Sequence, residues 1–384
     1  MVEEKEKPMA TGLLGNNVSG SVITTGYVTP QMYGCVGDGA TDDTANLSAC
    51  LNSGKPILLM GDFNITSRIV VTGACSIIGG GSTVSRIRLG TTSAGLTINI
   101  GGVGIPWGWD NFVNLRDFVL VPMVANISGS AVLVTASAAI GSSMPTAFIQ
   151  NVNVIPYNTT SYTQGGIAMQ DCRNFTIDSC QLLGCYGNDQ QGSGISVYAS
   201  LPNGAPCNFK ITNNSVAWWF NGIYIGPYSA TSGTNDPEGS YIIHNDLLAC
   251  LYAVNAQSND LSGTALFVEQ CNISFGACGI YCINVSIPMI KDNYLLANQW
   301  NTSSSSYGMI IASTRGESLY GVITGNFINF VNGRNSTSRV GIYEGCASGA
   351  TWNIIHSNQT LYATTPFTLT TSQTGVGSGG GFSH

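Results

Sequence analysis

The feature that most constrains this chain is a short pattern that returns nine times between residues 115 and 358. Each copy is a short apolar stretch that ends in an aliphatic residue, followed by turn residues rich in Asn, Asp and Ser. The aliphatic residues are 22 to 34 positions apart: Leu115, Ile149, Ile177, Ile211, Ile243, Val268, Ile290, Ile323 and Ile355. A repeat of this length indicates a solenoid, in which each unit buries its apolar side against its neighbours.

A second motif, glycine followed by an aliphatic residue, lies between most of these copies. It occurs at Gly166, Gly194, Gly222, Gly279, Gly308 and Gly341, with a degenerate copy at Ala253. The segments are short, β-branched and bounded by Gly or Asn, and their polarity alternates with a period of two. The sequence therefore predicts an all-β fold, a single-stranded parallel β-helix whose inward side chains stack coil upon coil.

One turn of each coil is predicted to carry a row of stacked amides, since side-chain amides of this kind pair well between identical turns. Its members are Asn213, Asn245, Asn293, Asn326 and Asn358, allowing an offset of one position.

Ahead of the repeats, the acidic motif "GDGATDDT" at residues 37–44 precedes a short helical stretch, "TANLSACLNSG". Thr41 or Asp42 is predicted to cap the start of this helix, and Gly54 to end it. A solenoid exposes an apolar end that must be covered, and an amphipathic helix would cover it. Asp38, Asp42 and Asp43 are therefore interpreted as structural rather than catalytic.

This acidic motif, the short helix and the following "KPILLMGDFNIT" together resemble the N-terminal signature of the pectate-lyase-superfamily right-handed parallel β-helix. Bacteriophage tailspikes, capsule depolymerases and some glycoside hydrolases share that signature. The resemblance covers residues 33 to about 70. It implies a right-handed helix, a polysaccharide partner, a homotrimer, and a place in a phage virion tail or outside the cell.

The chain divides into four expected regions. Residues 1–26 form a charged leader or arm, 27–100 the N-terminal cap and first coils, 101–370 the β-helix, and 371–384 a flexible Gly/Ser-rich tail. No signal peptide is seen, and no apolar run is long enough to span a membrane.

Composition excludes further classes. Only 9% of residues are charged, the net charge is −7, and Lys and Arg do not cluster, which argues against nucleic acid as a partner. The 12 cysteines include no CxxC pair and are expected to be buried free thiols. The three histidines have no zinc-ligand spacing, so neither a metal nor another cofactor is expected.

The candidate catalytic residues are carboxylates, because glycosidic bonds are cleaved by paired Asp or Glu side chains. Asp236 and Glu238 lie in one loop and Glu317 in another. Glu269 is predicted to stand in an outward row between His244 and Lys291. The alternative interpretation of this row is an ordinary surface charge ladder.

The candidate substrate-binding residues are aromatic. Tyr224, Tyr281 and Tyr343 occupy outward positions of the Gly-Ile strands, and Trp218 and Trp219 precede one of them. An aromatic ring can stack on the apolar face of a sugar. A subunit interface is the alternative, since Tyr and Trp are enriched there too.

The sequence thus predicts a tailspike-like protein that binds a host cell-surface polysaccharide and depolymerises it by glycosidic bond cleavage, as a glycosidase or lyase. Two alternatives stay open: a non-catalytic receptor-binding or structural spike, and a free bacterial glycoside hydrolase or polysaccharide lyase. The fold does not choose among them, because function resides in sites grafted onto it.

Overall fold

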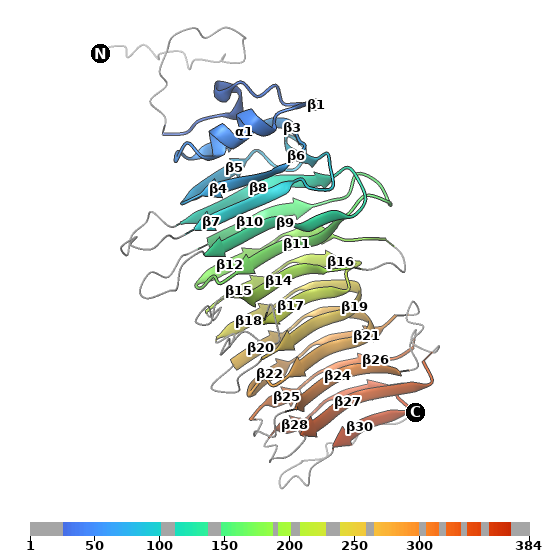
Figure 1. Ribbon diagram of the computed structural model, residues 1–384. Coiled ribbons are helices and arrows are strands. Elements are labelled where there is room, and N and C mark those ends of the chain that lie inside the picture. Colours follow the sequence, from blue (N-terminus) through green and yellow to red (C-terminus); the bar gives the residue numbers. More distant parts are fainter. Residues whose placement is uncertain are drawn as a thin grey trace, which may run out of the picture.

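The computed structural model describes residues 26–100, 112–136, 147–186, 191–200, 208–227, 239–258, 265–298, 305–314, 320–331, 336–346 and 353–369. In these ranges thirty strands pair in parallel and stack as rungs along one long axis, with the N-terminal cap at one end (Figure 1). Within the same ranges, no helix is long and apolar enough to cross a membrane.

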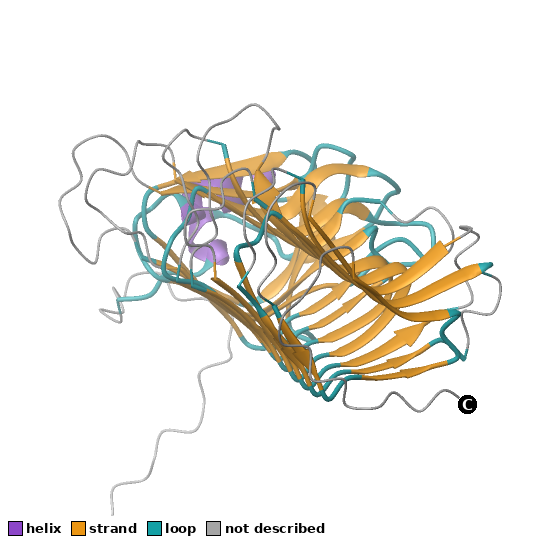
Figure 2. Ribbon diagram, turned by 90° about the horizontal axis from the view of Figure 1, so that it is seen from below, coloured by secondary structure: helices purple, strands orange, loops and turns teal. Residues whose placement is uncertain are grey.

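The strands form three faces, which meet at corners and whose inner sides face one another (Figure 2). Face 1 contains β2 (Ile57–Leu59), β5 (Cys75–Gly79), the first halves of β8 (Val113–Pro122) and β10 (Ala147–Val154), β12 (Phe175–Asp178), β15 (Lys210–Thr212), β18 (Ser240–Ile243), β20 (Ala265–Glu269), β22 (Ile287–Lys291), β25 (Val322–Thr324) and β28 (Ile354–His356).

Face 2 contains β1 (Asp38–Asp42), β3 (Gly61–Ile65), β6 (Ser85–Leu89), the second halves of β8 and β10, β13 (Gln181–Leu183), β16 (Ser215–Ala217), the first parts of β19 (Asp246–Gln257) and β21 (Asn272–Ile283), β23 (Tyr294–Ala297), β26 (Phe327–Asn329) and β29 (Gln359–Leu361). Face 3 contains β4 (Arg68–Thr72), β7 (Gly95–Ile100), β9 (Ile127–Ala136), β11 (Thr163–Gln170), β14 (Ser193–Ala199), β17 (Asn221–Pro227), the second parts of β19 and β21, β24 (Ser305–Ser313), β27 (Ser338–Cys346) and β30 (Thr365–Leu369).

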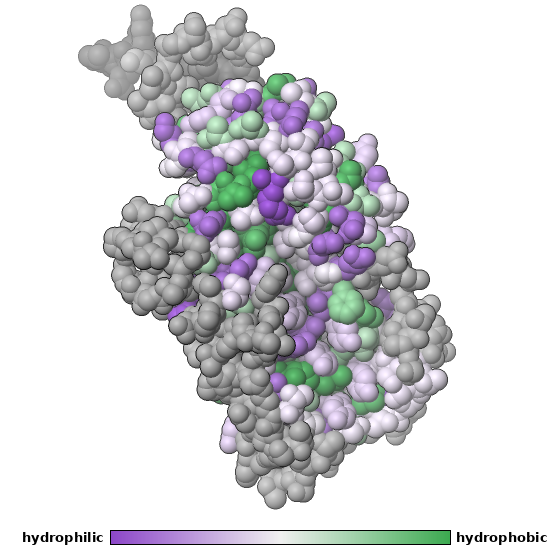
Figure 3. Space-filling view, in the orientation of Figure 1, coloured by the Kyte–Doolittle hydropathy of each residue, from purple (hydrophilic) through white to green (hydrophobic). Residues whose placement is uncertain are grey.

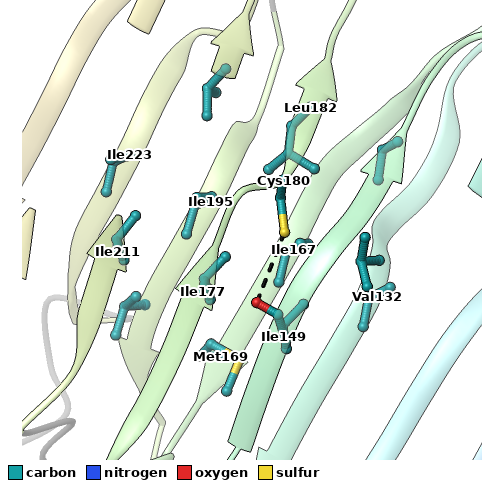
Figure 4. Packing of buried hydrophobic residues seen from close by; sticks show 14 of the residues in the cluster. Val132, Ile149, Ile167, Met169, Ile177, Cys180, Leu182, Ile195, Ile211 and Ile223 are labelled. Atoms are coloured by element: carbon teal, nitrogen blue, oxygen red, sulfur yellow. Dashed lines mark hydrogen bonds between the residues drawn. The ribbon is translucent and has the colours of Figure 1, made fainter. Parts of the chain in front are cut away.

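The core consists of columns of aliphatic side chains, one from each coil. On face 1, Ile149, Ile177 and Ile211 are in register, and each is fully buried (Figure 4). Face 3 contributes a parallel column in which Ile167 and Ile195 continue from Val132. Each fully buried side chain of this size contributes about 1.5–3 kcal/mol. The predicted parallel β-helix is confirmed.

The Gly-Ile motif marks a close approach between coils. A Cβ built on these glycines would lie 2.3–2.9 Å from the carbonyl oxygen of the residue below in the same column, for example 2.5 Å from Gly341 O at Gly308. Real Cβ atoms do not come this close to a backbone oxygen. Glycine recurs here because the next coil occupies the space of a side chain.

The corner between faces 1 and 2 has one left-handed residue in most coils: Asp117, Asn151, Ser179, Asn213, His244, Gln270, Asp292, Gly325 and Ser357. The residue after it points inward, and the buried amide row forms at that position. Asn326 Nδ2 donates to Asn358 Oδ1 at 2.8 Å, and Asn293 Nδ2 donates to Asn326 Oδ1 at 2.9 Å. Asn214, not the predicted Asn213, belongs to this row and donates to Asn245 Oδ1.

One of the nine aliphatic residues of the repeat was placed one position too late in the sequence analysis. Ile242, rather than Ile243, pairs in register with Ile211 and Val268 and is fully buried. Ile243 points outward between Thr212 and Glu269. Two adjacent isoleucines left the register ambiguous in the sequence, and the left-handed corner at the next residue fixes it.

The predicted capping helix is α1 (Thr44–Leu51), which follows the short 3-10 helix η1 (Pro30–Tyr33). It buries Leu47, Cys50 and Leu51. The N-cap residue is Asp43 rather than Thr41 or Asp42, but its side chain does not cap the helix. The helix ends at Leu51 with Asn52 as its C-cap, whereas the predicted Gly54 lies in the next turn with φ +69°.

The three aspartates are structural, as predicted. The Asp43 carboxylate is buried and accepts hydrogen bonds from Val36 N at 2.7 Å and Gly37 N at 3.0 Å. Asp42 accepts from Thr44 N at 3.0 Å, and Asp38 from Thr41 N at 2.8 Å. These bonds fold the acidic loop onto the cap.

The ten cysteines whose side chains the structure describes are all buried and free, which confirms the sequence interpretation for them. Cys180, for example, packs among the core aliphatic residues with its Sγ 4.0 Å from Ile149 O (Figure 4). Burial raises the pKa of Cys75 to about 12.

Candidate functional site

Face 3 presents one tyrosine on each of five successive coils, and we refer to these five residues as the tyrosine row: Tyr224, Tyr252, Tyr281, Tyr307 and Tyr343. They alternate between two columns. Tyr224, Tyr281 and Tyr343 share one column, separated by Asn255 and Ile310. Tyr252 and Tyr307 share the other and are separated by Cys278. Every ring of the row is partly exposed.

Neighbouring rings of the row hold one another in place. The rings of Tyr252 and Tyr281 meet edge to face with centroids 5.7 Å apart, and those of Tyr307 and Tyr343 do so at 6.3 Å. Phe220, at the corner beside the row, lies 5.5 Å from Tyr252. Edge-to-face contact is a preferred aromatic geometry. Rings fixed in this way lose little conformational entropy when a ligand binds.

The hydroxyl groups of Tyr224, Tyr252 and Tyr281 remain protonated at neutral pH. Burial raises the pKa of Tyr224, of Tyr252 and of Tyr281 above the ordinary tyrosine value. Each hydroxyl can therefore donate one hydrogen bond and also accept.

A chain of amides runs beside the rings. Gln257 Nε2 donates to Asn255 Oδ1 at 3.0 Å, Asn255 Nδ2 donates to Asn221 Oδ1 at 2.9 Å, and Asn221 Nδ2 donates to Ser193 Oγ at 3.2 Å. Apolar ring faces next to oriented, uncharged donors and acceptors suit a ligand that has both apolar faces and hydroxyl groups.

The five strand segments that carry the row contain only two charged residues, Arg339 and Glu344. Arg339 lies at the start of β27, in register with the buried Ser306. Glu344 points into the core below Ile311 and accepts a hydrogen bond from Asn353. On the side shown in Figure 3, residues of intermediate hydropathy are interspersed with several strongly hydrophilic and strongly hydrophobic patches.

The structure separates the predicted aromatic residues. Tyr224, Tyr281 and Tyr343 point outward in one column. Trp219 is fully buried and donates its Nε1 hydrogen to Leu182 O at 3.2 Å, so it cannot contact a ligand at the surface. Trp218 is a left-handed corner residue with φ 62°, and this turn directs the next side chain inward. Its ring is partly exposed and meets Tyr186 edge to face at 4.8 Å.

The sequence interpretation missed Tyr252 and Tyr307. Each directly precedes the glycine position of the repeat, namely Ala253 and Gly308. The signal that could have identified them is an aromatic residue directly before the glycine position, which occurs in these two of the seven copies.

Of the predicted acidic candidates, the structure describes only Glu269, which does not belong to the tyrosine row. Glu269 lies on the outer side of face 1, in register with Ile243 and Lys291, and makes no ion pair with Lys291 in the described part of the chain. His244 is not in that row; its Nε2 contacts Gln270 Oε1 at the corner. Asp236, Glu238 and Glu317 lie outside the described residues.

No protein-family model and no curated protein matches the sequence. Among solved structures, the chain is similar to tailspike protein 2 of Escherichia coli O157:H7 bacteriophage CAB120, with a TM-score of 0.58 and 16% identity over 88% of this chain and 43% of that one. It is also similar to the gp42 tailspike of Acinetobacter phage vb_AbaP_AS12, with a TM-score of 0.51 and 11% identity over 94% of this chain and 66% of that one. The chain thus spans about half to two thirds of the length of these tailspikes, and it shares their parallel β-helix fold.

Proposed function

We propose that the protein binds a cell-surface polysaccharide through the tyrosine row, as the glycan-binding part of a tailspike-like particle in a virion tail or outside the cell. The observation that carries this proposal is one partly exposed tyrosine per coil over five coils, four of them in edge-to-face pairs, on strands almost free of charge. A polysaccharide is a repeating ligand, and a solenoid offers it repeating contacts.

The test compares one tyrosine of the row with one outside it. Tyr281→Ala removes the middle ring, and Tyr294→Ala removes a more exposed ring on face 2 that stacks on Phe327. A central aromatic contact typically contributes about 2 kcal/mol or more, which corresponds to roughly a 30-fold loss of affinity. Polysaccharide binding is measured by calorimetry or on a glycan surface.

Tyr281→Ala should weaken polysaccharide binding by that factor, whereas Tyr294→Ala should bind like the wild type. Equal affinities for all three proteins would show that the ligand binds elsewhere.

Cleavage of the bound polysaccharide is a further part of the proposal. Asp236 and Glu238 follow β17 in the chain, and Glu317 follows β24. Each of these two strands carries one tyrosine of the row. Glu269 on face 1 is a candidate at a separate place, near the stacked rings of Tyr241 and Phe267.

Incubation with the bound polysaccharide should produce new reducing ends, and an elimination would add an absorbing double bond. Glu238→Gln or Glu317→Gln should stop this with binding intact, and Glu269→Gln tests the separate place. A wild-type protein that binds but produces neither signal is a non-catalytic spike.

We also propose that the chain assembles as a homotrimer. An apolar column on the outer side of face 1 supports self-association: Tyr241, Phe267, Met289, Val322 and Ile354 are in register on successive coils. Ile354 is 52% exposed in the single chain. Sedimentation equilibrium of the wild type and of Met289→Glu tests this, with a trimer that dissociates in the variant as the expected result.

A further inference from the structure

We infer that the ligand of the tyrosine row is an uncharged, extended glycan that lies along the helix axis and is recognised in steps of two coils. This inference rests on the proposed function and specifies the substrate class of the same site. It follows from the spacing of the rings, the charge of the surface, and the residues that end the row.

The spacing gives the direction of the ligand. Coils are about 4.8 Å apart, so tyrosines in one column repeat every ~9.6 Å, and the whole row spans ~19 Å. In an extended pyranose chain, one ring advances by nearly the distance between neighbouring strands, and successive rings turn to opposite sides. The alternation of Tyr224, Tyr252, Tyr281, Tyr307 and Tyr343 between two columns matches this two-residue period.

The charge of the surface gives the class of sugar. The described row strands carry one cation, Arg339 at the start of β27, so a carboxylated or sulfated unit bound along the rest of the row would lose hydration without gaining an opposite charge, which is unfavourable. Two arginines on other described strands are used elsewhere: Arg88 pairs with Asp62 on face 2, and Arg68 donates to Ser128 O and Ser130 O near the N-terminal end of face 3. The net charge of −7 also repels a polyanion. Hydroxyl groups, in contrast, can be recognised by the partly exposed amides of Asn221 and Gln257, which the buried Asn255 holds in place.

The ends of the row give the length of the ligand. The column of Tyr224 continues toward the N-terminus with Ser196, and the column of Tyr343 continues toward the C-terminus with Thr368. Neither of these side chains offers a ring. The coil before Tyr224 does carry Tyr198, but in a different column, in register with Gln170 and Gly226. The two columns of the row therefore cover five coils, and about five sugar units.

The experiment begins with a panel of neutral and anionic bacterial polysaccharides on a surface, read with the wild-type protein at low and high salt. The polymer bound most tightly is then cut by partial acid hydrolysis and sized, and the affinity of each fragment is measured by calorimetry. Variants Tyr343→Ala and Tyr294→Ala are titrated with the same fragments, and a thermal melt confirms that both are folded.

The inference expects a neutral polymer as the tightest ligand, with an affinity that changes less than about twofold with salt. Affinity should rise with fragment length up to about five sugars and then level off. Tyr343→Ala should weaken binding of the five-sugar fragment about tenfold or more, leaving that of two-sugar fragments nearly unchanged. Tyr294→Ala should match the wild type.

Two results overturn the inference while leaving polysaccharide binding by the row intact. One is an anionic ligand whose binding weakens steeply with salt but still needs Tyr281. The other is an affinity that levels off at two or three sugars, which indicates a ligand lying across the coils. If no polysaccharide of the panel or of intact host cells binds, the proposed function fails, and the inference fails with it.

Discussion

The pair Ile242 and Ile243 offers the sharpest test of the coil register. Both are isoleucines on β18, one residue apart, and the structure assigns them to opposite sides of the same strand. Ile242 lies in the core column between Ile211 and Val268, whereas Ile243 lies outside between Thr212 and Glu269. We therefore compare Ile242→Asp with Ile243→Asp.

The expected magnitudes differ widely. Ile242→Asp loses about 1.5–3 kcal/mol of apolar burial and places a carboxyl group in a site without polar partners, which costs several kcal/mol more. The sum, about 5 kcal/mol or more, is comparable to the total stability of many domains. Ile243→Asp replaces a partly exposed side chain and adds a like charge opposite Glu269, which costs about 1 kcal/mol or less.

The measurement is the soluble yield of each variant together with its urea midpoint, followed by circular dichroism. Ile242→Asp should be insoluble or unfold at much lower urea, and Ile243→Asp should behave nearly like the wild type. If both variants were equally destabilised, or if Ile243→Asp were the worse, the assignment of this coil would be wrong.

Three further changes test other parts of the fold. Asp43→Ala should lower the unfolding free energy of the cap by about 2–3 kcal/mol in urea melts, because two backbone N–H groups, those of Val36 and Gly37, lose their acceptor. Asn326→Ala should cost about 3 kcal/mol on the same assay, since it breaks the amide row on both sides and removes the donor to Ile290 O, while Asn272→Ala, at an exposed position of β21, should have little effect. The free energy of unfolding should fall as pH rises from about 9 toward 12. Burial raises the pKa of Cys75 from 9.0 to about 12, so the folded state keeps a proton that the unfolded state releases. A free energy of unfolding that stays constant over this pH range would contradict this.

The architecture could be predicted from the sequence because each coil repeats the same order of residue types. The aliphatic residue, the polar outward residue, the left-handed corner and the inward amide follow one another in order, as at Ile290, Lys291, Asp292 and Asn293. The error at Ile243 arose where two aliphatic residues in a row satisfied the pattern equally well.

The site was predicted only in part because outward positions obey no such repeat. The sequence suggested that Trp219 lies at the surface, but its side chain is buried. It points inward because the backbone of the preceding residue, Trp218, is left-handed. Tyr252 was missed because its copy of the glycine motif carries Ala253. The neighbourhood of Glu269 was misjudged because it depended on the register of the coil before it.

On strand β21, three consecutive residues differ in their surroundings: one lies against the next coil, one in the core and one on the outer surface. Gly279 has no room for a Cβ, which would lie 2.7 Å from Gly308 O and 2.6 Å from Leu295 Cδ2. Ile280 is fully buried, and Tyr281 faces outward in the row. Gly279→Ala should therefore lower the unfolding midpoint while the protein that remains folded still binds the polysaccharide. Tyr281→Ala should do the opposite, with binding lost and the midpoint nearly kept. If the two variants changed stability and binding together, the outer surface could not vary independently of the core, and the tyrosine row would be part of the packing rather than a binding site.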